Sequence, residues 1–96
     1  MRFVSVLLLM VFVFTTVISA QKVVSDDTIY DEVRRKLARD PDVKGAAFEV
    51  DVKAGAVTVK GTVTKEKFKE KAERLIRRTK GVKSVNNQIE VKPVGI

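Results

Sequence analysis

The sequence of 96 residues contains no cysteine, no histidine and no tryptophan, and it has only two prolines. Without cysteine the chain can form no disulfide. Without cysteine or histidine it also lacks the usual ligands of zinc and the usual members of a nucleophilic triad. No glycine-rich phosphate-binding motif is present either. We therefore predict no enzyme activity, no cofactor, no bound metal and no small-molecule substrate.

Carboxylates remain as candidates for acid–base chemistry. Asp40 and Asp42 flank Pro41, and Glu49 and Asp51 occupy one face of a predicted strand. Acidic residues are common in exposed loops and on exposed sheet faces. We interpret both pairs as solvated acids without a catalytic role.

The one long apolar run of the sequence lies at its start, MRFVSVLLLMVFVFTTVISA. It has one early positive charge and ends in the small residues Ser19 and Ala20 before Gln21, a pattern typical of a signal peptide cleaved after Ala20. An uncleaved transmembrane anchor, which needs about 20 apolar residues, is the alternative. We predict a signal peptide at residues 1–20, a short linker at 21–25, and a periplasmic or secreted location.

An amphipathic helix is predicted next, in the segment that contains TIYDEVRRKLARDP. Ile29, Val33 and Leu37 recur every four residues and form one apolar stripe. Pro41 ends the helix, because proline disfavours helical geometry in the residue before it. The cap of the first turn is expected from Asp26, Asp27 or Thr28.

Two strands joined by a hairpin are predicted in AAFEVDVKAGAVTVKGTV, because apolar and polar residues alternate. The strands meet at Ala54 and Gly55, where glycine can take the positive φ of a tight turn. Gly61 lies on the inward face, and its missing side chain indicates either a close approach of a helix or a bulge. The inward positions are Phe48, Val50, Val52, Val57, Val59, Gly61 and Val63.

A second helix is predicted over residues 65–79, capped by Thr64 and stabilised at its start by a contact between Val63 and Phe68. Gly81 is expected to close it with a left-handed turn. The apolar face of this helix consists of Phe68, Ala72, Leu75, Ile76 and Thr79.

The last strand is predicted over residues 84–91, and its alternation places an amide, Asn87, on the inward face. Burying an amide without hydrogen-bond partners costs about 1 to 3 kcal/mol. We therefore expect Asn87 to bond a backbone group that the sheet leaves unpaired, in the loop at residues 41–45. The other inward residues are Val85, Ile89 and Val91.

The order helix, strand, strand, helix, strand predicts an α+β sandwich with two helices packed on one face of a three-stranded mixed sheet. The pattern D-x-x-I-x-x-x-V-x-x-x-L from Asp26 to Leu37, the run AGAVTVKGTV and the run GVKSVNNQIEV together resemble a BON domain. The resemblance covers residues 26–92 and leaves 93–96 as a tail. Its motif residues include Gly61, Gly81, Val82, Val85, Asn87, Ile89 and Val91.

This resemblance implies a non-enzymatic module, since members of the BON family are proposed to bind phospholipid membranes and several are linked to osmotic or envelope stress. Many members carry two such domains, whereas this sequence carries one. Lys60 and Ala56 also differ from the residues more usual around the hairpin. A single copy implies weak independent binding to a membrane.

Basic residues are concentrated on one face of the second predicted helix, KEKFKEKAERLIRR. At about 100° per residue, four of them fall within a sector about 60° wide beside the apolar face. One interpretation is an exposed helix stabilised by ion pairs of Glu70 with Arg74 and of Glu73 with Arg77. The alternative is a binding surface for an anionic partner, formed by Lys67, Lys71, Arg74 and Arg78.

The net charge of +7 and the basic helix face leave three classes of partner to weigh. A nucleic acid is rejected, because a single tyrosine offers little surface for base stacking and the glycine turn of a KH module is absent. We predict that the exported module binds an anionic phospholipid surface of the cell envelope. The alternative is an envelope protein, bound through the helix or the open face of the sheet.

The junction between Ala20 and Gln21 gives the first testable prediction. The mature protein is expected to begin at Gln21 and to be soluble outside the cytoplasm, because the small residues before Gln21 suit the peptidase. Intact-mass measurement of exported material checks this. Material that still carries Met1 and is found in a membrane fraction would support the anchor instead.

Overall fold

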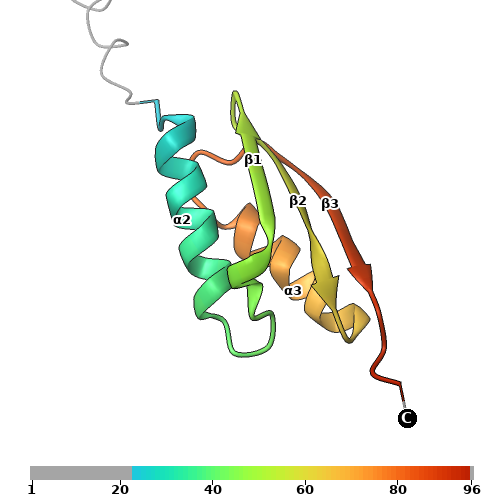
Figure 1. The fold of residues 1–96 in the computed structure, drawn as a ribbon. Helices are drawn as coiled ribbons and strands as arrows, with labels where there is room; N and C mark the ends of the chain where they lie inside the picture. Colours follow the sequence, from blue (N-terminus) through green and yellow to red (C-terminus); the bar gives the residue numbers. More distant parts are fainter. Residues whose placement is uncertain (1–22, 96) are drawn as a thin grey trace, which may run out of the picture.

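The computed structural model describes residues 23–95, which form two helices packed against a three-stranded mixed sheet (Figure 1). The α+β fold and the order of its elements are as predicted. The predicted signal peptide, residues 1–20, lies outside the described residues. The elements are helix α2 (Asp26–Arg39), the 3-10 turn η3 (Gly45–Ala47), strands β1 (Glu49–Lys53) and β2 (Ala56–Val63), helix α3 (Glu66–Arg77) and strand β3 (Ser84–Val91).

The sheet has the order β1-β2-β3, with β1 antiparallel to β2 and β2 parallel to β3. A parallel pair requires a crossover connection, and α3 provides it between the end of β2 and the start of β3. Both helices lie on the same side of the sheet (Figure 1). The opposite face stays open, and its polar side chains, such as Glu49, Lys60 and Gln88, are exposed.

The core lies between the two helices and the covered face of the sheet. Ile29, Val33 and Leu37 of α2 are all buried, which confirms the predicted stripe. Strand β1 lies at an edge of the sheet, and its inward residues Val50 and Val52 are only partly buried. The other buried apolar side chains are Val43, Phe48, Val57, Val59, Val63, Ala72, Ile76 and Ile89.

The start of α2 differs from the prediction, because none of the three expected residues is its N-cap. Ser25 is the N-cap, and its hydroxyl accepts a hydrogen bond from the Thr28 N–H at 3.3 Å. Asp26 lies one residue inside the helix, and its carboxylate accepts hydrogen bonds from the backbone N–H groups of Ala54 and Gly55 at 2.8 and 3.0 Å. Asp26 therefore holds the distant hairpin turn instead of its own helix end.

The β1–β2 turn is held from two sides. Ala54 (φ 49°) and Gly55 (φ 81°) both have left-handed geometry, as a two-residue type I′ turn requires. The Gly55 carbonyl accepts a hydrogen bond from the Lys83 N–H at 2.8 Å. The Asp26 carboxylate and the loop before β3 consequently fix the turn between them.

Neither predicted explanation of Gly61 is correct. The pairing of β2 with β3 runs through Gly61 and Ile89 without a bulge, and no helix occupies the space beside the glycine. The ring of Phe48 fills that space, and a Cβ at Gly61 would come within 2.7 Å of Phe48 Cε1. Glycine is therefore required at position 61 because any side chain there would clash with the ring of Phe48, which directly precedes β1.

Both ends of α3 also differ in detail from the prediction. Thr64 is not the cap, because the backbone is still extended at Lys65, which is the N-cap and has no side-chain capping bond. At the other end the helix stops at Arg77, and Gly81 follows in the connecting turn. The predicted left-handed geometry of Gly81 is confirmed (φ 95°), and a Cβ there would lie 2.8 Å from Val24 Cβ.

Asn87 faces inward as predicted, but its partners are not in the loop at residues 41–45. Its Nδ2 donates to the Lys69 carbonyl in α3 at 3.0 Å, and its Oδ1 accepts from the Ile89 N–H at 3.1 Å. The predicted location was wrong because α3, and not the loop, covers β3.

The Ile89 N–H is a group that the sheet leaves unpaired. Successive N–H groups of a strand point to opposite sides, and the Lys92 N–H points to β2, where it donates to the Val63 carbonyl at 2.8 Å. Three residues earlier, the Ile89 N–H points to the free edge of β3. Asn87 therefore pairs an edge donor and connects β3 to α3 at the same time.

Replacement of Asn87 by alanine is expected to destabilise the domain by about 1 to 3 kcal/mol, because the Ile89 N–H loses its acceptor inside the protein. Asn86→Ala is the matched control, since Asn86 is exposed on the open face of the sheet. The control should be nearly neutral in denaturant melts. Equal losses in the two variants would contradict the assigned register.

Candidate functional site

The four basic residues predicted as a binding surface lie on α3 and directly after it. Lys67, Arg74 and Arg78 are exposed. Lys71 is partly buried, with 32% of its side chain accessible. The spacing of three and four residues places all four on one side of the helix, but their surroundings differ.

Lys71 is engaged within the domain. Its Nζ lies 2.8 Å from Asp42 Oδ2 and 3.1 Å from Asp40 Oδ2. Asp40 Oδ1 in turn accepts hydrogen bonds from the N–H groups of Asp42 and Val43 at 2.9 and 3.0 Å. The interpretation of these two acids as merely solvated was wrong, because with Lys71 they connect the loop after α2 to the middle of α3.

The environment of this network favours its charged form. Desolvation by itself would raise the pKa of Asp40, whose side chain is only 11% exposed. Hydrogen bonds from the Val43 N–H, from Lys71 and from the Asp42 N–H outweigh that effect and hold the pKa of Asp40 below its ordinary value. Hydrogen bonds to Asp42 and then Asp40 raise the pKa of Lys71. The network is therefore strongest when Asp40 is ionised.

The other three predicted basic residues make no ion pair with any residue in the range 23–95. The predicted pair of Glu73 with Arg77 is present, with Arg77 Nη2 3.0 Å from Glu73 Oε2. The predicted pair of Glu70 with Arg74 does not form within the same residues, which leaves Arg74 without an acidic partner there. We use the name α3 basic surface for Lys67, Arg74 and Arg78.

A shallow groove next to this surface adds a residue that the sequence pattern missed. It has a volume of about 360 Å³ and lies between the end of α2 and α3, with Arg39 on one side and Leu75 and Arg78 on the other. Lys36 also lines it, but its Nζ donates to Thr79 Oγ1 at 3.1 Å. Arg39 could be recognised only after packing placed the two helices side by side.

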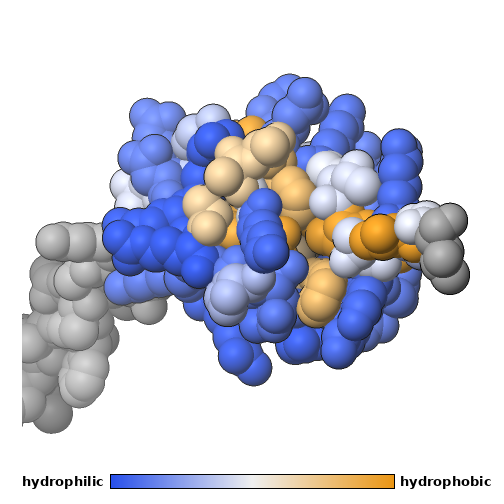
Figure 2. All heavy atoms as spheres, turned by 60° about the horizontal axis from the view of Figure 1, so that its bottom comes forward, coloured by the Kyte–Doolittle hydropathy of each residue, from blue (hydrophilic) through white to orange (hydrophobic). Residues whose placement is uncertain are grey.

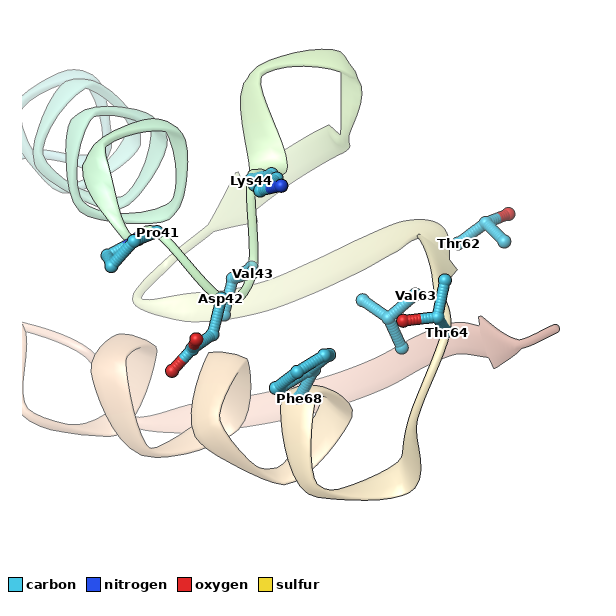
Figure 3. A pocket seen from close by; sticks show the side chains of 8 residues that line it. All are labelled: Pro41, Asp42, Val43, Lys44, Thr62, Val63, Thr64 and Phe68. Atoms are coloured by element: carbon cyan, nitrogen blue, oxygen red, sulfur yellow. The ribbon is translucent and has the colours of Figure 1, made fainter. Parts of the chain in front are cut away.

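A second hollow, also of about 360 Å³, opens where β2 ends and α3 begins (Figure 3). Val63 and Phe68, which were predicted to stabilise the helix start, both line it. The Nζ atoms of Lys65 and Lys67 lie 5.8 and 5.6 Å from the centroid of the Phe68 ring. The lining consists of Pro41, Asp42, Val43, Lys44, Thr62, Val63, Thr64 and Phe68.

The described part of the chain contains no group of three or more acidic residues placed to hold a metal ion. No helix within residues 23–95 is long and apolar enough to cross a membrane. Figure 2 shows the end of the domain at the bottom of Figure 1, where apolar side chains are surrounded by hydrophilic ones. The surface thus offers cationic groups beside accessible apolar groups.

Comparison with protein-family models gives a match to the BON domain over residues 25–93. The chain belongs to the BON domain family. The match includes every helix and strand of the structure and confirms the family that the sequence resembles. BON domains are binding modules of a non-catalytic type that are linked to phospholipid membranes. A search of curated proteins found no match.

The ion pair of Asp40 gives a prediction about pH. Since its folded pKa lies below an unfolded value of about 3.9, its contribution to stability is present above that pH and is lost as the pH falls through the folded pKa. Asp40→Asn keeps an oxygen for the Val43 N–H but removes the charge. We expect this variant to lose on the order of 1 kcal/mol or less at about pH 7, the size of a partly exposed ion pair.

Denaturant melts at about pH 7 and about pH 3 measure this effect. The Asp40→Asn variant should lose less stability between the two pH values than the wild type does. Asp51→Asn is the control, because Asp51 is exposed on the open face of the sheet and makes no ion pair within the described residues. Identical acid sensitivity of Asp40→Asn and wild type would contradict the role assigned to the charge.

Proposed function

We propose that this BON domain binds anionic phospholipid surfaces of the cell envelope, outside the cytoplasm, as a non-enzymatic module. The observation that supports this proposal most directly is the α3 basic surface, whose three cations are exposed and make no ion pair within the described residues. Arg39 extends the cationic area across the groove. Guanidinium groups match the geometry of phosphate oxygens, which phospholipid headgroups present in a dense layer.

The expected affinity of this surface is low. A basic residue near an anionic membrane contributes about 1 kcal/mol, so that the three residues of the α3 basic surface give about 3 kcal/mol. A dissociation constant of 1 mM corresponds to about 4 kcal/mol. Charge alone therefore gives millimolar binding that salt weakens. A weak and reversible contact of this kind suits an accessory role in osmotic or envelope stress.

An envelope protein is the second candidate partner, because one face of the sheet is uncovered. That face has shallow hollows of about 320 and 440 Å³. Its exposed charges are of both signs, which favours a protein partner over an anionic membrane for this face. The charged residues that line the two hollows are Glu49, Asp51, Lys60 and Glu90.

Co-sedimentation with vesicles of phosphatidylglycerol and phosphatidylcholine tests the proposal, with protein taken from the soluble exported fraction. The wild type should bind at low salt, bind more as the anionic fraction rises, and dissociate at high salt. Simultaneous replacement of Lys67, Arg74 and Arg78 by glutamate should lower the bound fraction at least tenfold.

The matched control replaces Lys53, Lys60 and Lys83 by glutamate, which changes the net charge equally at exposed positions away from α3. This control should bind nearly as well as the wild type. Equal losses in the two triple variants would show that only net charge matters. Absence of wild-type binding at low salt would refute the proposed function and favour the protein partner.

A further inference from the structure

The hollow at the start of α3 is lined by apolar and polar side chains in equal number, and Phe68 is the largest of the apolar ones. Phe68 is only partly buried, and Val43, Val63 and Pro41 lie around the same hollow (Figure 3). Phe68 lies in the first turn of α3, beside the hollow, and like Leu75 it is partly buried and packs against the core. This end of the domain therefore presents apolar surface where a solvated helix end would ordinarily be polar.

Positive charge surrounds this apolar surface. Of the acids nearby, Asp42 shares Lys71 with Asp40, and the Nζ of Lys92 lies 3.5 Å from the carboxylate of Glu90. Glu66 in the first turn of α3 is a further exposed acid near this end. The cations around the hollow and the Phe68 ring are Lys44, Lys65 and Lys67.

The C-terminal tail brings a second apolar side chain to the same end. The Lys92 N–H donates to the carbonyl of Val63, a residue of the hollow, at 2.8 Å. Val94 follows two residues later and is 76% exposed. The chain after β3 runs to the end of the domain at which α3 begins (Figure 1). The tail that carries the exposed valine thus leaves β3 beside Val63, at the end of the domain where α3 begins.

We propose that this Phe68 end, defined by Phe68, Val94 and the lysines 44, 65 and 67, is the part of the domain that enters the headgroup layer of an anionic membrane. The inference rests on the proposed function and adds the orientation of the bound domain. Apolar side chains ringed by lysines match an interface in which acyl chains lie below anionic phosphates. The lysines extend their ammonium groups to the phosphates while the phenyl ring and the valine enter the apolar layer.

In this orientation the three residues of the α3 basic surface contribute unequally to binding. With a rise of about 1.5 Å per residue, Arg74 lies about 10 Å and Arg78 about 16 Å along the axis from Lys67. At physiological ionic strength, exposed charges are screened beyond about 8 Å. Lys67 is therefore the closest of the three to the phosphates, Arg74 contributes when the helix lies obliquely, and Arg78 contributes least.

Single tryptophan residues can report the orientation, because the chain has no tryptophan of its own. The test uses Phe68→Trp and Val94→Trp, and the exposed position of Val94 means that the second variant does not depend on core packing. Tyr30→Trp is the control, since Tyr30 is 36% exposed in the N-terminal half of α2, a helix that begins at the opposite end of the domain (Figure 1). Each variant is mixed with phosphatidylglycerol vesicles whose acyl chains carry bromine, a contact quencher of tryptophan.

Fluorescence of Phe68→Trp and Val94→Trp is expected to fall at least twofold and to shift to the blue, while Tyr30→Trp changes little. Co-sedimentation of the same samples separates the two proposals. If all three variants bind the vesicles, but only Tyr30→Trp is quenched or no variant is quenched, the orientation is wrong and the proposed function still stands. Failure of the wild type to sediment with the vesicles would overturn both.

Discussion

Packing of two helices against one face of a small sheet is the constraint on which the rest of this domain depends. No disulfide is available to a chain without cysteine, and a core of this size supplies only a few kcal/mol. Polar groups at the margins of the core must therefore be paired, since each unpaired one costs a large part of that stability. Asp26 at the hairpin, Asn87 at the edge of β3 and Lys71 beside the loop after α2 each meet this requirement.

These contacts also decide which charges remain for a partner. Four basic residues share one side of α3, but Lys71 faces two carboxylates of the preceding loop and is committed to the fold. Lys67, Arg74 and Arg78 make no such contact within residues 23–95. The α3 basic surface thus consists of the cations of this helix that form no ion pair within the described residues. The loop that Lys71 holds also forms one wall of the hollow beside Phe68, so that the same ion pair stabilises the fold and shapes the surface.

Membership of the BON family indicates a binding module but does not identify its partner. Within residues 23–95, the helix side of the domain has cations without an ion pair near accessible apolar side chains, which suits an anionic lipid surface. The open face of the sheet has charges of both signs, which suits a protein. The two sides of the sheet therefore differ in the chemistry that they can recognise, because the helices cover only one of them.

The elements, their order, the inward face of each strand and the family could be predicted from the sequence, because hydrophobic period and turn residues are local properties. The contacts between distant residues became visible only in the fold: Phe48 beside Gly61, Lys69 bonded to Asn87, and Lys71 between Asp40 and Asp42. Lys71 and Asp42 are 29 positions apart in the sequence. Contacts at such separations depend on how the helices pack against each other and against the sheet. Residue spacing within a single helix or strand gives no information about that packing. Helical spacing could consequently place four cations on one face of α3, and only packing could show which of them is already paired.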